Sequence, residues 1–254
     1  MLRAILWDVD GTLAETERDG HLVAFNCAFE ALGLTWRWSE ARYGELLVVA
    51  GGRERLLYDM RSQPLAPPDG PERAALVERI HRLKNDYYAA IVAAGALPLR
   101  AGVAQLFADC ATAGLSMGIA TTTSAANVAA LLSAHLGSDW RSHFAAVICA
   151  EQAPLKKPDP QVYLRALQTL DLTPEEVLAI EDSPAGVAAA RTAGIAVVVA
   201  RSFYFADIDV SAALSAGPSL ASARGWKPLP GAAGDHRIAL SDLVAWHRAR
   251  PPRP

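Results

Sequence analysis

The chain has 254 residues, of which 52% are hydrophobic and 20% are charged, and its formal net charge at pH 7 is −3. These values are ordinary for a globular protein, and the length allows one large domain or two smaller ones. The near-neutral charge gives no electrostatic footprint for nucleic acid, and no apolar run approaches the ~20 residues of a membrane-spanning helix. We therefore expect no nucleic-acid partner and no membrane partner.

Cysteines and histidines are few and scattered. The three cysteines, Cys27, Cys110 and Cys149, include no CxxC pair, and an odd, sparse count suits a reducing cytoplasm. Acidic residues interrupt the first apolar stretch after Trp7, so we expect no signal peptide and a cytoplasmic localisation. The six histidines lack metal-binding spacing, so we interpret them as surface or packing residues and expect no zinc site.

The first predicted element is a buried strand over residues 4–9 that ends in carboxylates. The sequence AILWDVDG places Asp8 and Asp10 on either side of Val9, directly before Gly11. Charge at the tip of a core strand is costly unless it is compensated. A single DxD pair is a weak signal, because it also fits a turn with a capping residue.

A long helical segment follows, over residues 15–97. One apolar helix face lies within 22–32 and ends at Gly33, and another lies within 76–91. No strand signal interrupts these patterns. We therefore predict an α-helical cap that is inserted directly after the first strand.

The predicted cap has a mechanical consequence. It would sit over the carboxyl end of the first strand and act as a lid, with hinges near Leu13–Thr16 and Leu97–Gly102. Residues 1–14 and 98–254 would then form the catalytic core.

The rest of the chain alternates strands and helices. Four further apolar runs are predicted as strands, at residues 116–121, 145–150, 177–180 and 195–200. Helices are predicted at residues 102–113, 159–170, 173–176 and 186–193, and from residue 241 onward. Continuous apolar strands favour a parallel sheet covered on both faces. We therefore predict an α/β fold with a Rossmann-like doubly wound parallel sheet, and interpret 216–235 only as an irregular surface excursion.

Polar side chains come after each of four predicted strands. They are Asp8 and Asp10, then Thr121 to Ser124, then Lys157, and finally Glu181 and Asp182. Each feature alone fits an ordinary role: a capped turn, a strand-end packing residue, a solvated loop lysine or a helix N-cap. In open parallel sheets, however, ligands bind outside the carboxyl ends of the strands. Four such features in chain order therefore favour a functional crevice.

The chemistry of these residues indicates phosphoryl transfer. Several carboxylates in one crevice coexist when a divalent cation lies among them, and oxygen ligands favour Mg²⁺. Asp8 can act as a nucleophile that forms an aspartyl phosphate, while Asp10 can protonate the leaving oxygen and later take a proton from water. Lys157 and Thr121 can bind the oxygens of the transferred group.

As a set, these motifs resemble those of the haloacid dehalogenase superfamily. The matching segments are DVDGT at 8–12, Thr121, Lys157 within KKPDP, and EDSPAG at 181–186. The helical insertion resembles that family's small α-helical cap. The resemblance implies that Asp8 is the nucleophile, Asp10 is the acid/base, and Thr121 and Lys157 bind the transferred phosphoryl group.

The same resemblance implies a magnesium site. Its ligands would be the Asp8 carboxylate, the Asp10 backbone carbonyl and Asp182, with Glu181 as an outer or occasional ligand. The dehalogenases that gave the superfamily its name lack the second aspartate and the metal. The presence of Asp10 and Asp182 therefore favours phosphoryl transfer in this chain.

Finer features resemble the CbbY phosphatases, which are associated with the Calvin cycle and hydrolyse xylulose-1,5-bisphosphate. The segments concerned are 15–17, 50–55 (AGGRER), 119–124 (IATTTS) and 202–204. The resemblance implies that Glu17 contacts substrate hydroxyls and that Arg53 and Arg55 hold a distal phosphate as bidentate donors. Further substrate-binding residues would be Gly51, Gly52, Thr122, Thr123 and Ser124. Arg53 stands where the family pattern has lysine, and GGR alone also fits a helix-start turn with a surface arginine.

Three functions remain open at this point. The first is a Mg²⁺-dependent phosphatase acting on a sugar bisphosphate, xylulose-1,5-bisphosphate above all, or on another small phosphate ester. The second is a phosphosugar mutase of the β-phosphoglucomutase type, in which a sugar hydroxyl instead of water attacks the aspartyl phosphate. The third is a non-catalytic phosphate-binding scaffold. In the first two cases the partner is a small phosphorylated sugar, and the chain is expected to be a monomer or weak dimer.

Overall fold

The computed structural model describes residues 1–63, 65–229 and 236–250. Its strands are β1 Ala4–Trp7, β2 Ser116–Ala120, β3 Ala146–Ile148, β4 Val177–Glu181, β5 Ala196–Ala200 and β6 Ser215–Gly217. They form one sheet in the order β3-β2-β1-β4-β5-β6, and every neighbouring pair is parallel. The predicted Rossmann-like doubly wound fold is confirmed.

Helices cover both faces of this sheet. The core helices are α5 Val103–Thr112, α6 Ala125–Leu136, α7 Gln161–Leu170, α8 Pro184–Thr192 and α9 Leu240–Ala249. In β1, Ile5 and Trp7 belong to the hydrophobic cluster of α5, α6 and α9, whereas Ala4 and Leu6 belong to that of α7 and α8. Because successive strand residues point to opposite faces, an entirely apolar strand is the one that fits between two helical layers.

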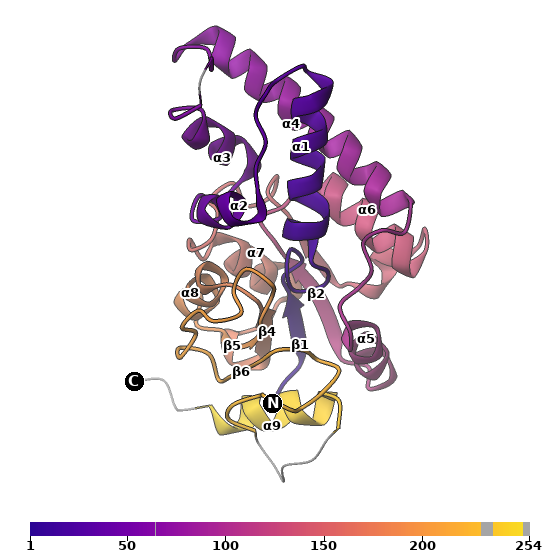
Figure 1. The fold of residues 1–254 in the computed structure, drawn as a ribbon. Coiled ribbons are helices and arrows are strands. Elements are labelled where there is room, and N and C mark those ends of the chain that lie inside the picture. The colour runs from indigo at the N-terminus through magenta and orange to yellow at the C-terminus, as the bar shows by residue number, and fades with distance from the viewer. Residues whose placement is uncertain (64, 230–235, 251–254) are drawn as a thin grey trace.

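A second group of helices lies over the carboxyl ends of the strands (Figure 1). Its members are the π-helix η1 Thr16–Leu22, α1 Val23–Ala31, α2 Glu40–Leu46, α3 Gly52–Asp59 and α4 Pro71–Ala93. Phe25, Phe29, Trp38 and Tyr43 pack in their own hydrophobic cluster. No helix of the described residues is both long and apolar enough to cross a membrane. The division into a core and a mobile 15–97 cap, with its two hinges, stays a prediction.

Several element boundaries differ from those predicted. The capping residues at 159–160 precede a helix that begins at Gln161, because the Asp159 side chain accepts a bond from the Gln161 amide at 2.9 Å. The capping box at Thr173 forms as expected, but it starts only the short 3-10 turn η3, Pro174–Glu176. A second 3-10 turn, η2, spans Trp140–His143.

The segment after residue 214 differs most from its interpretation as a surface excursion. Ser215–Gly217 forms the edge strand β6, which pairs with β5. Trp226 is 2% exposed, stacks on Trp246 of α9 with ring centroids 5.0 Å apart, and donates to the Ser219 carbonyl at 2.7 Å. Residues 230–235 of this segment lie outside the described residues. The described part is built into the hydrophobic core.

This packing predicts a stability effect of Trp226→Ala. Truncating a buried Trp removes apolar contacts and leaves a cavity, so the free energy of unfolding should fall by about 3–5 kcal/mol. Denaturant unfolding followed by circular dichroism measures the change. Trp226→Phe, which keeps an aromatic ring, should lose less unfolding free energy than Trp226→Ala. A Trp226→Ala variant within about 0.5 kcal/mol of the wild type would contradict the structural role.

Candidate active site

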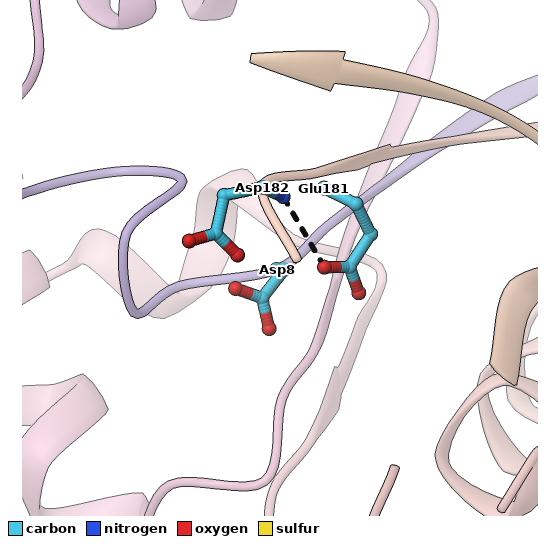
Figure 2. A group of neighbouring side chains, drawn as sticks. All are labelled: Asp8, Glu181 and Asp182. Atoms are coloured by element: carbon cyan, nitrogen blue, oxygen red, sulfur yellow. Dashed lines mark hydrogen bonds between the residues drawn. The ribbon is translucent and has the colours of Figure 1, made fainter. Parts of the chain in front are cut away.

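The site lies where β1 and β4 run side by side. The chain leaves these two neighbouring strands toward opposite halves of the sheet, a point at which open α/β sheets bind ligands. Asp8 directly follows β1, Glu181 is the last residue of β4, and Asp182 follows it. Their carboxylates are buried, and one oxygen of each lies within 4.8 Å of the others. Figure 2 shows the three side chains next to one another.

Lys157 holds two of these acids together. Its Nζ donates to Asp8 Oδ1 at 2.6 Å, to Glu181 Oε1 at 2.7 Å and to the Ala120 carbonyl at 2.9 Å, which uses all three ammonium protons. Tyr163 of α7 donates a further bond to Glu181 Oε1 at 2.5 Å. Burial alone would lower the pKa of Lys157, but Asp8 and Glu181 outweigh burial and raise it above its usual value. The lysine therefore stays charged.

The cluster carries excess negative charge. Of the three buried carboxylates, Lys157 binds those of Asp8 and Glu181, whereas the Asp182 carboxylate accepts from the Ser202 hydroxyl at 2.6 Å and has no ion-pair partner among the described residues. Burial raises the pKa of Asp8 to about 7, and burial together with Asp8 and Glu181 raises that of Asp182 well above its usual range. A set of buried oxygen donors with unbalanced charge fits a hard divalent cation such as Mg²⁺.

Gly11 allows the acids to approach one another. Its φ is +80°, and a Cβ at this position would lie 2.0 Å from Asp182 Oδ2. Any other residue would therefore collide with the Asp182 carboxylate and strain the backbone. The glycine lets the loop after Asp10 close over the end of β4.

The Asp10 carboxylate bonds to the first residues of the helical group. Its Oδ1 accepts from the Thr16 hydroxyl at 2.6 Å and lies 3.2 Å from His21 Nε2. Burial alone would raise the pKa of Asp10, but His21 and Thr16 lower it to about 2. Asp10 is therefore ionised. His21 is buried and packs on Tyr88 with ring centroids 4.5 Å apart, which fits its interpretation as a packing residue, and it also contacts this predicted site carboxylate.

The hydroxyl residues after β2 occupy different positions. Thr121 is buried, and its Oγ1 accepts from the Thr123 amide at 3.3 Å. Thr122, Thr123 and Ser124 line a cavity, whereas Thr121 is not among the residues of its wall. Ser124 also caps α6 by accepting from the Asn127 amide at 3.3 Å.

This cavity has a volume of about 440 Å³ and lies between the strand ends and the α1–α4 helices. Asp8, Asp10, Lys157 and Asp182 line its floor. The side chains contributed by the helical group include Glu17, Arg53, Arg55, His81 and Lys84. Acids and cations from both parts of the molecule thus face one space, which suits a polyanionic ligand.

The two predicted cap arginines differ in environment. Arg55 is 5% exposed, its Nη1 donates to the Tyr43 hydroxyl at 2.6 Å, and its buried Nε has no partner among the described residues. Arg53 is half-exposed and makes a bidentate pair with Glu78 at 2.6 and 3.0 Å. Arg55 is therefore the more deeply placed of the two donors.

The loop before α3 joins the helical group to the core. Lys156 Nζ lies 2.6 Å from Glu54 Oε1, and it occupies the space where a Cβ on Gly51 would sit, at 1.9 Å. Gly51 has a φ of +98°, so its lack of a side chain permits both the backbone turn and the ion pair. Gly52, the first residue of α3, also lines the cavity.

Comparisons with known proteins agree with this geometry. Residues 2–194 match the haloacid dehalogenase-like hydrolase family. The chain is 46% identical over 249 residues to a CbbY protein of Cupriavidus necator, covering 97% of each chain. It also resembles two crystal structures of CbbY from Rhodobacter sphaeroides, one with xylulose-(1,5)bisphosphate (40% identity) and one with phosphate (41% identity). Each match has a TM-score of 0.80 and covers 86% of this chain and 95% of the other.

The chain belongs to the haloacid dehalogenase-like hydrolase family. Within it, the similarity to CbbY proteins and the parallel-sheet fold make the chain a hydrolase of the phosphatase type. The individual roles given to Asp8, Asp10, Thr121 and Lys157 remain predictions, although the structure brings Asp8 and Lys157 into direct contact.

Several residues of this hydrolase site escaped the sequence analysis. Tyr163 lies on an apolar helix face and carries no motif, and Ser202 lies in the predicted segment 202–204, but its bond to Asp182 was not predicted. His81 and Lys84 are three residues apart on α4, and both line the cavity. Their spacing along one helix face carries little signal, because Arg79, Arg82 and Asp86 nearby give the helix an ordinary charged surface pattern.

Lys84 is a buried cation that lacks a carboxylate partner within ion-pair distance in the described part of the chain. Its Nζ lies 5.5 Å and 5.3 Å from the ring centroids of Phe25 and Tyr88 and 3.4 Å from Asn85 Oδ1. Burial lowers the pKa of Lys84 to about 8. Keeping this lysine charged in the folded protein therefore costs free energy.

We predict that Lys84→Met stabilises the protein at pH 7, by on the order of 1–2 kcal/mol once the lost cation–π contacts are deducted. Below pH 8, the pKa of Lys84 in the folded protein, the cost of burying the charged lysine is present in full. This cost disappears as pH rises toward 10.5, the usual pKa of a lysine. The difference in unfolding free energy between variant and wild type should shrink over that range. Lys227→Met, at an exposed lysine, should show neither effect. A Lys84→Met variant less stable than wild type at pH 7 would refute the prediction.

Proposed function

We propose that this chain is a Mg²⁺-dependent phosphatase that hydrolyses xylulose-1,5-bisphosphate through an aspartyl phosphate on Asp8. The observation that supports it most is the buried cluster of Asp8, Lys157, Glu181 and Asp182, of which Asp8, Lys157 and Asp182 line the floor of a cavity whose roof carries cations. The similarity to a CbbY protein crystallised with that bisphosphate supports the same substrate.

Magnesium fits the residues at the strand ends. The Asp8 carboxylate, the Asp10 backbone carbonyl and Asp182 would hold it, with Glu181 as an outer ligand. When bound, the ion would offset the negative charge of the carboxylates and of the phosphoryl oxygens, which lowers the barrier to attack by an anion. Binding of the ion would thus balance the excess negative charge of the cluster.

The first step transfers the phosphoryl group to the protein. A carboxylate oxygen of Asp8 forms a bond to phosphorus as the bond between phosphorus and the sugar oxygen breaks, and the sugar oxygen receives a proton from Asp10. Lys157 already contacts Asp8 Oδ1, so its ammonium group lies where it can offset charge on the transferred oxygens.

The second step releases inorganic phosphate. A water oxygen forms a bond to phosphorus, the bond between phosphorus and Asp8 breaks, and Asp10 accepts a proton of the water. Thr16 and His21 hold Asp10 ionised, which is the state that accepts a proton. Donation in the first step requires that Asp10 carry a proton when the ester bond breaks. That proton is taken up from solvent before the first turnover, and the proton accepted from water in the second step restores it for the next.

The roof of the cavity would provide selectivity for a second phosphate. Arg55 and Arg53 would bind the distal phosphate, Glu17 would bind sugar hydroxyls, and Thr122 to Ser124 would bind near the scissile group. The buried Nε of Arg55 supports the assignment for that arginine, because it has no acceptor among the described residues and an anionic ligand would supply one. Arg53 would have to exchange its pair with Glu78 for the phosphate. Closure of the cap over the bound sugar would exclude water other than the attacking molecule.

Kinetics and product analysis test the proposal. We expect the wild type to release phosphate from xylulose-1,5-bisphosphate when Mg²⁺ is present, and EDTA to stop the reaction. Asp8→Asn should lower kcat by a factor of at least about 10⁴, because it removes the nucleophile. The folded state of Asp8→Asn is checked by circular dichroism.

Two outcomes would contradict the proposal. Full activity of Asp8→Asn would exclude the covalent route. Conversion of a hexose 1-phosphate to its isomer, primed by a trace of bisphosphate and without net phosphate release, would instead identify a mutase of the β-phosphoglucomutase type.

A further inference from the structure

We infer that Tyr43 is a positioning residue that keeps Arg55 available for the distal phosphate. The inference rests on the proposed bisphosphatase function and adds a residue to it. Tyr43 lies on α2, outside every segment that carries a sequence motif, and its side chain is fully buried.

The Tyr43 hydroxyl lies between two groups of the substrate cavity. It donates to Glu17 Oε2 at 2.5 Å and accepts from Arg55 Nη1 at 2.6 Å. Burial raises the pKa of Tyr43 well above its usual value, so the phenol keeps its proton. One proton and one lone pair then settle the direction of both bonds.

This arrangement separates the carboxylate from the guanidinium. Arg55 Nη1 is 3.4 Å from Glu17 Oε2, a long contact compared with the two bonds through the phenol. Glu17 lies within ion-pair distance of Arg55, and in a buried setting a short bidentate pair between them would be strong. Such a pair would occupy the donors of Arg55 and neutralise its charge. With the phenol bonded to both groups, their direct contact is limited to the single 3.4 Å pair.

The ring of Tyr43 fixes the hydroxyl and the guanidinium together. The Arg55 guanidinium carbon lies 4.9 Å from the centroid of the ring. The ring of Tyr43 also packs on Phe25, Trp38 and, from the loop after β5, Tyr204, with ring centroids 6.4, 5.7 and 5.9 Å away. The phenol therefore cannot rotate away, and Arg55 is held with its buried Nε free of protein acceptors among the described residues.

Tyr43→Phe tests the inference because it keeps the ring and removes only the hydroxyl. KM for xylulose-1,5-bisphosphate should rise roughly tenfold, because Arg55 is diverted into a direct pair with Glu17. The kcat for the bisphosphate should stay within about twofold of the wild-type value. KM for each of the two corresponding xylulose monophosphates should rise less than KM for the bisphosphate, because Glu17 contacts sugar hydroxyls in all three substrates whereas the second phosphate is present only in the bisphosphate. A crystal structure of the variant should show Glu17 Oε2 and Arg55 Nη1 closer than the present 3.4 Å.

Tyr204→Phe is the matched control. It removes a hydroxyl from the neighbouring ring, and that hydroxyl is buried without a partner in the described residues. Its KM for the bisphosphate should equal that of the wild type. Thermal unfolding of both variants shows whether any change in KM reflects a loss of folded protein.

The outcomes separate this inference from the proposed function. If the wild type prefers the bisphosphate to both monophosphates but Tyr43→Phe leaves KM unchanged, the inference is wrong and the proposed function stands. An equal rise in KM for bisphosphate and monophosphates would also overturn it, since Arg55 would then not be the group affected. If the wild type shows no preference for the bisphosphate, the proposed function fails, and the inference fails with it.

Discussion

The ammonium group of Lys157 is the contact on which the rest of the site depends. It reaches from the loop after β3 across the end of β2 to bind Asp8 and Glu181, the side chains at the ends of β1 and β4. Without it, adjacent buried carboxylates would repel each other and take up protons. One lysine cannot balance three acids, however, and the remaining negative charge is what gives the site its affinity for a divalent cation. The cations of the cavity roof face these acids across the same cavity.

Contacts between the helical group and the core lie on two sides of the cavity. On the chain-crossing side, Arg100 donates to the carbonyls of Gly11 and Ala200, at 2.5 and 2.8 Å, and pairs with Glu15 at 3.2 Å. On the far side, Glu54 pairs with Lys156, the neighbour of the site lysine. The loop that carries the nucleophile is thus tied to the end of β5, while the ion pair connects the arginine-bearing α3 to the loop of Lys157. If the predicted cap opens away from the core, the Glu54–Lys156 pair would have to break.

The sequence made part of this site predictable, for physical reasons. Charged residues at the ends of apolar strands are costly, so Asp8, Glu181 and Asp182 stood out, and parallel strands bring their carboxyl ends to one edge. The strand β6 was missed because Ser-Ala-Gly has no apolar or β-branched run. Tyr43 and His21 were missed because their contacts come from tertiary packing, and no local pattern distinguishes a buried tyrosine that bridges two charges from one that only fills space.

The central claim is that the buried acids at the strand ends form a magnesium site. Calorimetric titration of the substrate-free protein with Mg²⁺ at pH 7 tests it most directly, with Asp182→Asn as the variant. That substitution keeps the size of the side chain and removes one of the three negative charges. We predict one binding event in the wild type and its loss, or a weakening of at least about tenfold, in a folded Asp182→Asn protein. Equal Mg²⁺ affinity in the two proteins, or no binding to the wild type, would contradict the account.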